Sequence, residues 1–233
     1  MEPKLFGIEH ILYIVITTII GGVGLLIAYK YAKKEKTQTI ILKCLAIFLF
    51  VSILTNRLSQ VFRYDVIRWY CIIPDSYCGM TSLVLSLAVL LGKKDNGVLH
   101  FTWLLGLFGG VSTVIYASFV DQGPTLFYLP TISGLLHHSF SATLVIALLM
   151  FKQIDITYKK WYYTLFGFTC YITVGVFLMY KFEVNDAFHI VEPLLPNTNL
   201  TAWVMGPIYA ISYAIILFSI EFVKKKTQTI KTI

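Results

Sequence analysis

The sequence predicts an all-α membrane protein: one domain, residues 1–233, built as a polytopic bundle of about seven transmembrane helices. Of the 233 residues, 57% are hydrophobic and only 13% are charged, so a soluble fold would lack the polar residues needed to cover its surface. The apolar runs are close to the length of about 20 residues that crosses a bilayer core roughly 30 Å thick. These observations exclude a soluble enzyme.

The first predicted span, residues 8–29, carries its lysines after the apolar run and has no small-residue cleavage site, as expected for a retained helix rather than a signal peptide. The second, residues 40–60, leads into a segment of mixed charged and aromatic residues, 61–73, which suits the headgroup region. The third, residues 77–92, is short for a full crossing.

The fourth predicted span, residues 98–120, contains Gly106 and Gly110, and small residues of this kind let helix backbones approach closely. The fifth, residues 129–151, carries two adjacent histidines in an otherwise apolar run. The remaining predicted elements are spans at residues 161–180 and 201–223 and a solvated cytoplasmic tail at residues 224–233.

Lysine and arginine are distributed one-sidedly over the alternate connections. Cytoplasmic loops of membrane proteins keep the positive charge, so the richer side predicts the cytoplasmic face. We therefore expect a multi-pass cell-membrane protein with its N-terminus outside and its C-terminus in the cytoplasm. The richer side holds Lys30, Lys33, Lys34, Lys36, Lys43, Lys93, Lys94, Lys152, Lys159, Lys160, Lys224, Lys225, Lys226 and Lys231, and the poorer side holds Lys4, Arg57, Arg63, Arg68 and Lys181.

The same distribution accounts for the formal net charge of +7, so no nucleic-acid partner is expected, and the predicted partners are membrane lipids. The four cysteines form no CxxC pair, which argues against a metal site, and no cofactor is predicted. Cys71 and Cys78 are close enough in sequence to form a disulfide in an oxidising compartment, or to stay reduced. The oligomeric state stays open.

Polar side chains gather in the outer half of the predicted bundle. Such groups are costly in lipid unless they face a partner or a water-filled cavity, so they are candidates for function. The candidates are Glu9, His10, Arg57, Cys78, His137, His138, Asn185, Asp186 and His189.

His138 lies about 12 Å below the outer end of its span, from the helical rise of 1.5 Å per residue. An imidazole at that depth either bridges helices by hydrogen bonding or exchanges a proton, while His137 points about 100° away on the helix. A reactive thiol needs a nearby base that favours its thiolate form. If the third and fifth spans are neighbours, His138 is placed to act as that base for Cys78.

Arg57, with Asn56, either holds an anionic group such as a lipid phosphate or extends its charged end to the interface. Glu9 and His10 lie at the entrance of the first span, where they either contribute to an outer pocket or cap the helix.

The order and spacing of several short motifs resemble the bacterial YwaF-like integral membrane family, which is grouped with eukaryotic transmembrane protein 164. The resemblance runs along nearly the whole chain. The motifs that carry it are Phe6-Gly7-Ile8-Glu9-His10, Pro74-x-x-x-Cys78, His138-Ser139, Asn185 before Pro193, and Gly206-Pro207.

This resemblance implies a thiol-dependent acyltransferase that remodels phospholipids, with Cys78 as the acyl-carrying nucleophile and His138 as its general base. At three positions the chain departs from the family pattern: Ser76, Ser139 and Glu192 stand where relatives favour histidine, glycine and lysine.

Two other interpretations remain open from the sequence. In a carrier, channel or receptor, Arg57, His138 and Asn185 would hold a small molecule or lipid headgroup while Cys78 only packs. The predicted substrate-binding residues are Arg57, His137, Asn185 and His10. A structural subunit of a larger complex is the third. The acyltransferase interpretation requires that Cys78 and His138 meet near the outer leaflet.

Overall fold

The computed structural model describes residues 6–63, 66–121, 123 and 125–231, and this part of the chain is helical. Lys4 and the last two residues of the predicted tail, 232–233, lie outside it. The helices are α1 (Ile8–Tyr31), α2 (Glu35–Val61), α3 (Tyr77–Leu91), α4 (Gly97–Ile115), α5 (Leu129–Met150), α6 (Tyr162–Phe182) and α7 (Ala202–Lys231), with short 3-10 helices η1 (Trp69–Ile72), η2 (Ala117–Phe119) and η3 (Tyr158–Lys160).

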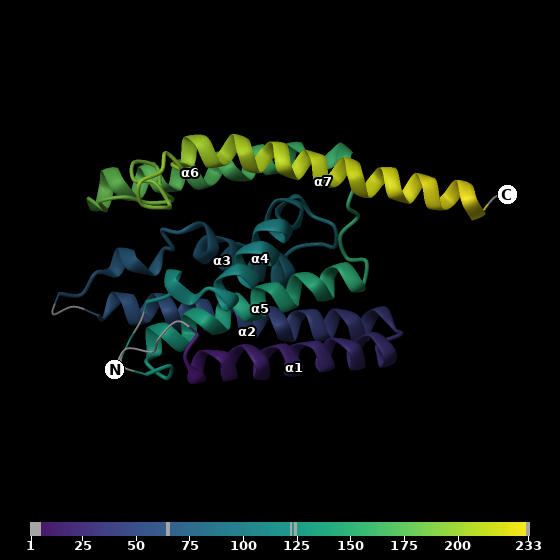
Figure 1. The fold of residues 1–233 in the computed structure, drawn as a ribbon, viewed down its shortest axis with the longest axis horizontal. Coiled ribbons are helices and arrows are strands. Elements are labelled where there is room, and N and C mark those ends of the chain that lie inside the picture. Colours follow the sequence, from purple (N-terminus) through teal and green to yellow (C-terminus); the bar gives the residue numbers. More distant parts are fainter. Residues whose placement is uncertain (1–5, 64–65, 122, 124, 232–233) are drawn as a thin grey trace.

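Six of these helices are long and apolar enough to cross a membrane, and α3, with 15 residues, is shorter. The prediction of an all-α membrane bundle is therefore confirmed, and the chain is a multi-pass membrane protein. α1 begins at one end of the long axis of the molecule, and α7 runs past the other end (Figure 1). The first and last helices therefore start and finish at opposite ends of the molecule.

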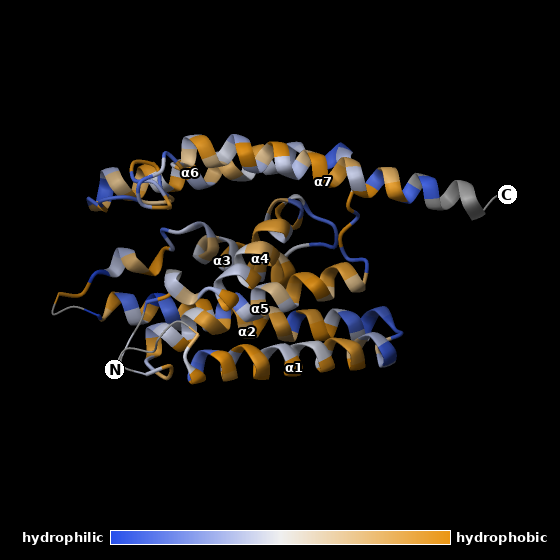
Figure 2. Cartoon of the chain, viewed as in Figure 1, coloured by the Kyte–Doolittle hydropathy of each residue, from blue (hydrophilic) through white to orange (hydrophobic). Residues whose placement is uncertain are grey.

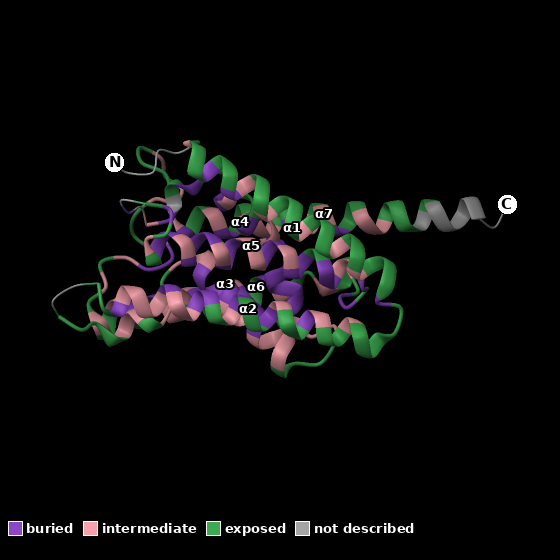
Figure 3. Cartoon of the chain, turned by 90° about the horizontal axis from the view of Figure 1, so that it is seen from below, coloured by how far each residue is buried: buried purple, intermediate pink, exposed green. Residues whose placement is uncertain are grey.

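The bundle has two unequal parts. α5 lies between α2 and α4, and α3 packs against α2, α4 and α5, so these four helices form the core. α6 and α7 lie together as a separate layer beside α3 and α4 (Figure 1). Buried residues gather along the central helices, whereas α1 is green along most of its length in Figure 3.

Apolar side chains cover the outside of the molecule. On α1, Ile8 and Ile20 are 79% and 68% exposed, and on α7, Ile211 and Phe218 are 62% and 66% exposed. Orange bands run along both helices in Figure 2, and blue segments gather where α1 meets α2 and on α7 just before its grey end. Exposed surface of this kind is stable in lipid and not in water.

Three predicted boundaries are wrong. The second helix begins at Glu35 rather than Ile40. The fourth helix ends at Ile115 rather than Val120, because the apolar residues that follow bend into η2, where Ala117 and Val120 are buried against Leu135 of α5. The seventh helix continues to Lys231, so most of the predicted tail is helical. An apolar run does not distinguish a helix from a buried loop.

At the lysine-rich end, one carboxylate joins three segments. Asp95 accepts hydrogen bonds from Lys160, from the backbone N–H of Asp155 at 2.8 Å and from the His100 ring at 2.7 Å. Partial burial acts to raise the pKa of Asp95, but the hydrogen bonds from Lys160, Asp155 and His100 outweigh it and lower that pKa below its ordinary value of 3.8. Asp95 therefore fastens the α3–α4 turn to the α5–α6 connection.

We expect Asp95→Asn to destabilise the protein at neutral pH by about 1–3 kcal/mol, the range for hydrogen bonds to charged groups. Because the native pKa is lowered, the stabilisation is complete above pH 3.8 and is lost as the pH falls through the lowered value. Thermal unfolding in detergent at pH 7 and in acid measures this, with the exposed pair Glu35–Lys94 as a control through Glu35→Gln. Equal melting temperatures of wild type and Asp95→Asn at pH 7 would contradict the assignment.

Candidate functional site

The site begins with the close approach of α4 and α5. A Cβ atom at Gly110 would lie 2.6 Å from the backbone oxygen of His138 and 3.0 Å from the backbone nitrogen of Ala142, so only glycine fits there. One turn away, Ser141 Oγ donates to the carbonyl oxygen of Gly106 at 3.2 Å. The predicted role of these glycines in helix packing matches their contacts, and they bring the histidine pair against α4.

Cys78 lies in the first turn of α3. Ser76 is the N-cap, and its hydroxyl accepts a hydrogen bond from the backbone N–H of Gly79 at 3.2 Å. This bond fixes the start of the helix at Tyr77. From there the thiol reaches α4, because a Cβ at Gly109 would lie 2.9 Å from Cys78 Sγ. All four cysteines are free thiols, so the sulfur of Cys78 is not consumed by a disulfide with Cys71.

His138 reaches the same glycine from α5. It is 6% exposed, and its ring lies close to the backbone of Gly109. A neutral imidazole carries one N–H and keeps a lone pair on its other nitrogen. The thiol of Cys78 and the imidazole of His138 thus converge on one residue of α4 from two different helices, and the imidazole has a nitrogen able to accept a proton.

His137 also belongs to this cluster, on a different side. Its Nδ1 lies 3.1 Å from Ser82 Oγ of α3, and its ring lies beside that of His138, tilted by 32° with centroids 4.2 Å apart. The hydrogen bond ties α5 directly to α3, so the two spans are neighbours. Ser82 was missed by the sequence reasoning, although it is one helical turn after Cys78 and therefore on the same face of α3.

An apolar cavity of about 270 Å³ opens beside the thiol, between α3, α4 and α7. Besides Cys78 and Gly109, it is lined by residues of α7 such as Tyr209 and Ile216. Tyr77 also lines it, and the buried hydroxyl of Tyr77 has no hydrogen-bond partner among the residues that the structure describes. Its polar groups are few, as in sites that bind hydrocarbon chains.

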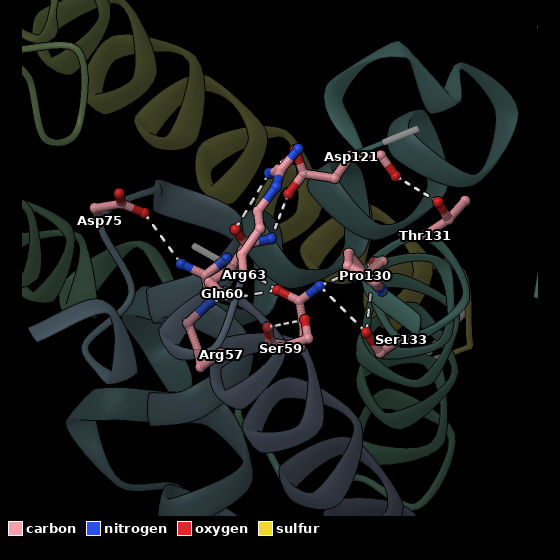
Figure 4. A network of polar contacts seen from close by, with 10 residues as sticks. Arg57, Ser59, Gln60, Arg63, Asp75, Asp121, Pro130, Thr131 and Ser133 are labelled. Carbon is pink, nitrogen blue, oxygen red and sulfur yellow. Dashed lines mark hydrogen bonds and ion pairs between the residues drawn. The ribbon is translucent and has the colours of Figure 1, made fainter. Parts of the chain in front are cut away.

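Arg57 takes part in a polar network at the same end of the bundle (Figure 4). Its guanidinium donates to Asp75 Oδ1 at 3.1 Å and to Asn56 Oδ1 at 2.9 Å, and Asn56 in turn donates to the carbonyl oxygen of Pro130 at 3.0 Å. A second part of the network joins Arg63 to Asp121 at 2.9 Å. The arginine proposed to hold an anion is thus already paired, and it links α2 to the segment before α3.

Two other predicted site residues lie elsewhere. The His10 ring accepts a hydrogen bond from the backbone N–H of Phe6 at 3.2 Å and donates to the carbonyl oxygen of Val114 at 2.9 Å. Both nitrogens are therefore used, one to order the start of α1 and the other to attach α1 to α4. Asn185 is exposed in the loop after α6 and does not line the cavity beside Cys78.

Within the described ranges, no group of three or more His, Cys, Asp or Glu side chains is placed to hold a metal ion. The reactive groups at the cluster are the thiol of Cys78, the imidazoles of His137 and His138, and the hydroxyls of Ser82 and Tyr77. No protein-family model, curated protein or solved structure matches this chain. The function is argued below from the cluster itself.

Proposed function

We propose that the protein is a membrane-embedded thiol-dependent acyltransferase that remodels phospholipids, as the resemblance to the YwaF-like family implies. The observation that carries the proposal is that Cys78 and His138, from α3 and α5, both lie against Gly109. A nucleophile and a base with a free lone pair are the two groups that acyl transfer through a covalent intermediate requires. The predicted pair is thus supported by its placement.

The reaction has two balanced halves. First, His138 takes the proton of the Cys78 thiol, and the sulfur attacks the ester carbonyl carbon of a phospholipid. A C–S bond forms, the C–O bond to the lysophospholipid breaks, and the leaving oxygen takes the proton back from the imidazolium. In the second half, the hydroxyl of another lysophospholipid gives its proton to His138, and its oxygen attacks the thioester carbonyl carbon. A C–O bond forms, the C–S bond breaks, and the sulfur takes the proton from the imidazolium, which restores the thiol.

The position of the thiol supports a lipid substrate. Cys78 is in the first turn of α3, and the exposed Asp75, which pairs with Arg57, lies just before this turn. The thiol therefore lies near the level where headgroups meet hydrocarbon. Ester groups of phospholipids lie at that level, and the apolar cavity between α3, α4 and α7 offers room for the acyl chain. This end is opposite to the lysine-rich end, so we propose a phospholipid rather than cytoplasmic acyl-CoA as the acyl donor.

The test uses purified protein with a phospholipid that carries a labelled acyl chain and an unlabelled lysophospholipid acceptor. We expect wild type to transfer the label and to carry a hydroxylamine-sensitive acyl group on Cys78, and Cys78→Ala to lose both. Cys170→Ala removes an exposed thiol on α6 and serves as the matched control, with activity retained. Full transfer activity in Cys78→Ala would overturn the proposal.

The carrier interpretation is supported less well by the geometry. It needs Arg57, His138 and Asn185 around one ligand, but Arg57 is paired with Asp75 and Asn185 is exposed in a loop. Thioester formation on Cys78 is the measurement that separates the two functions.

A further inference from the structure

A larger apolar groove, of about 560 Å³, lies between α3, α4 and α6. It runs alongside α3 from Met80 to Gly92, a separation of 12 residues. At the helical rise of 1.5 Å per residue this is about 18 Å, which is close to one leaflet of a hydrocarbon core roughly 30 Å thick. The groove therefore has the length of one acyl chain.

Side chains packed against glycines build the wall of this groove. A Cβ at Gly97 would lie 2.4 Å from the ring of Tyr163, and one at Gly167 would lie 2.2 Å from the ring of Phe101. These contacts hold α4 and α6 together on one side of the groove, while α3 forms the other side. The space is thus defined by packed aromatic rings rather than by loose helix ends.

The groove ends among cations. Gly92 and Asn96 line its lysine-rich end, and Lys93 between them is exposed, as is Lys159 in the η3 turn that precedes Tyr163. The ion pairs of the neighbouring lysines are known: Lys94 with Glu35, and Lys160 with Asp95. In the part of the chain that the structure describes, neither Lys93 nor Lys159 takes part in an ion pair.

Aromatic residues mark the same level. Trp161 and Tyr162, which follow Lys160, are 48% and 49% exposed, and tryptophan and tyrosine are enriched where headgroups meet hydrocarbon. Lys93, next to the lining residue Gly92, and Lys159, four residues before the lining residue Tyr163, therefore lie near headgroup level at this end of the groove. Positive charges at this level attract anionic lipids.

We propose that this groove binds an anionic phospholipid, with one acyl chain between α3, α4 and α6 and the phosphate at Lys93 and Lys159. The bound lipid would fill the seam between the core helices and the α6–α7 layer. The phosphate end of the site is at the opposite end of α3 from Cys78, and no residue lines both this groove and the cavity beside Cys78, so the proposal does not depend on the acyltransferase function.

The test measures phosphatidylglycerol and phosphatidylcholine retained by the purified full chain, using native mass spectrometry. We expect the double variant Lys93→Gln/Lys159→Gln to reduce phosphatidylglycerol retention by about 10-fold, with little effect on phosphatidylcholine. The control is Lys34→Gln/Lys36→Gln, which removes the same charge from exposed positions at the α1–α2 turn and should change retention by less than about twofold. Equal losses in both double variants would overturn the proposal, because they indicate general attraction to a basic surface.

A second variant tests the acyl chain. Ala88 lines the groove, and Ala88→Phe fills it without a change of charge, so both phospholipids should be retained less. Its melting temperature shows whether it folds, and Val84→Phe, at another lining position, replaces it if it does not. Undiminished retention in the folded variant would show that the chain is not in the groove.

Discussion

Replacing His138 with Gln is expected to lower the rate of acyl transfer by about 10²- to 10⁴-fold, the usual contribution of a general base. Glutamine keeps a donor for the Gly109 backbone but cannot accept the proton of the Cys78 thiol, so packing is preserved while the base is lost. Initial rates of labelled acyl transfer, with the level of acyl-Cys78, measure the effect.

The adjacent histidine gives the matched comparison. His137 is hydrogen-bonded to Ser82 of α3. His137→Gln should therefore reduce the rate less than His138→Gln does, because it shifts α5 but leaves the base in place. If His137→Gln is the more damaging of the two, the roles of the two histidines are assigned the wrong way round. If both retain the wild-type rate, His138 is not the base.

Gly110→Ala is expected to destabilise the bundle by about 1–3 kcal/mol, as overpacking of a well-packed core does. The added Cβ would meet the backbone oxygen of His138 at 2.6 Å, and backbone cannot turn away as a flexible side chain can. The helices α4 and α5 must separate, and because the contact is at His138 the acyl-transfer rate should fall as well. Thermal unfolding in detergent and the transfer assay measure the two effects.

The control is Gly22→Ala in α1, where a Cβ would meet nothing within 4 Å. Alanine is a better helix former than glycine by about 1 kcal/mol, so this variant should be neutral or slightly more stable. A Gly110→Ala protein as stable as Gly22→Ala would mean that α4 and α5 are not in close contact at this point.

The membrane architecture was predictable because hydrophobicity in long runs is a local property that the sequence displays directly. The starts of α1, α3 and α5 agree with the predicted spans to the residue. The end of α4 did not, since Ala117 and Val120 continue the apolar run but are buried in a bend against Leu135 of α5. Which way an apolar run turns depends on what it packs against, and that information is not local.

The candidate site was predictable in part. The sequence alone determined the helical membrane architecture and the presence of a thiol and two imidazoles in apolar segments, because residue type and spacing fix these. Tertiary structure decided which polar groups meet. It placed Cys78 and His138 against Gly109. It also brought His137 within hydrogen-bond distance of Ser82 and paired Arg57 with Asp75. The physical reason is that helix rotation and close approach are set by packing between helices, and glycines such as Gly110 act only through the neighbour that the fold brings to them.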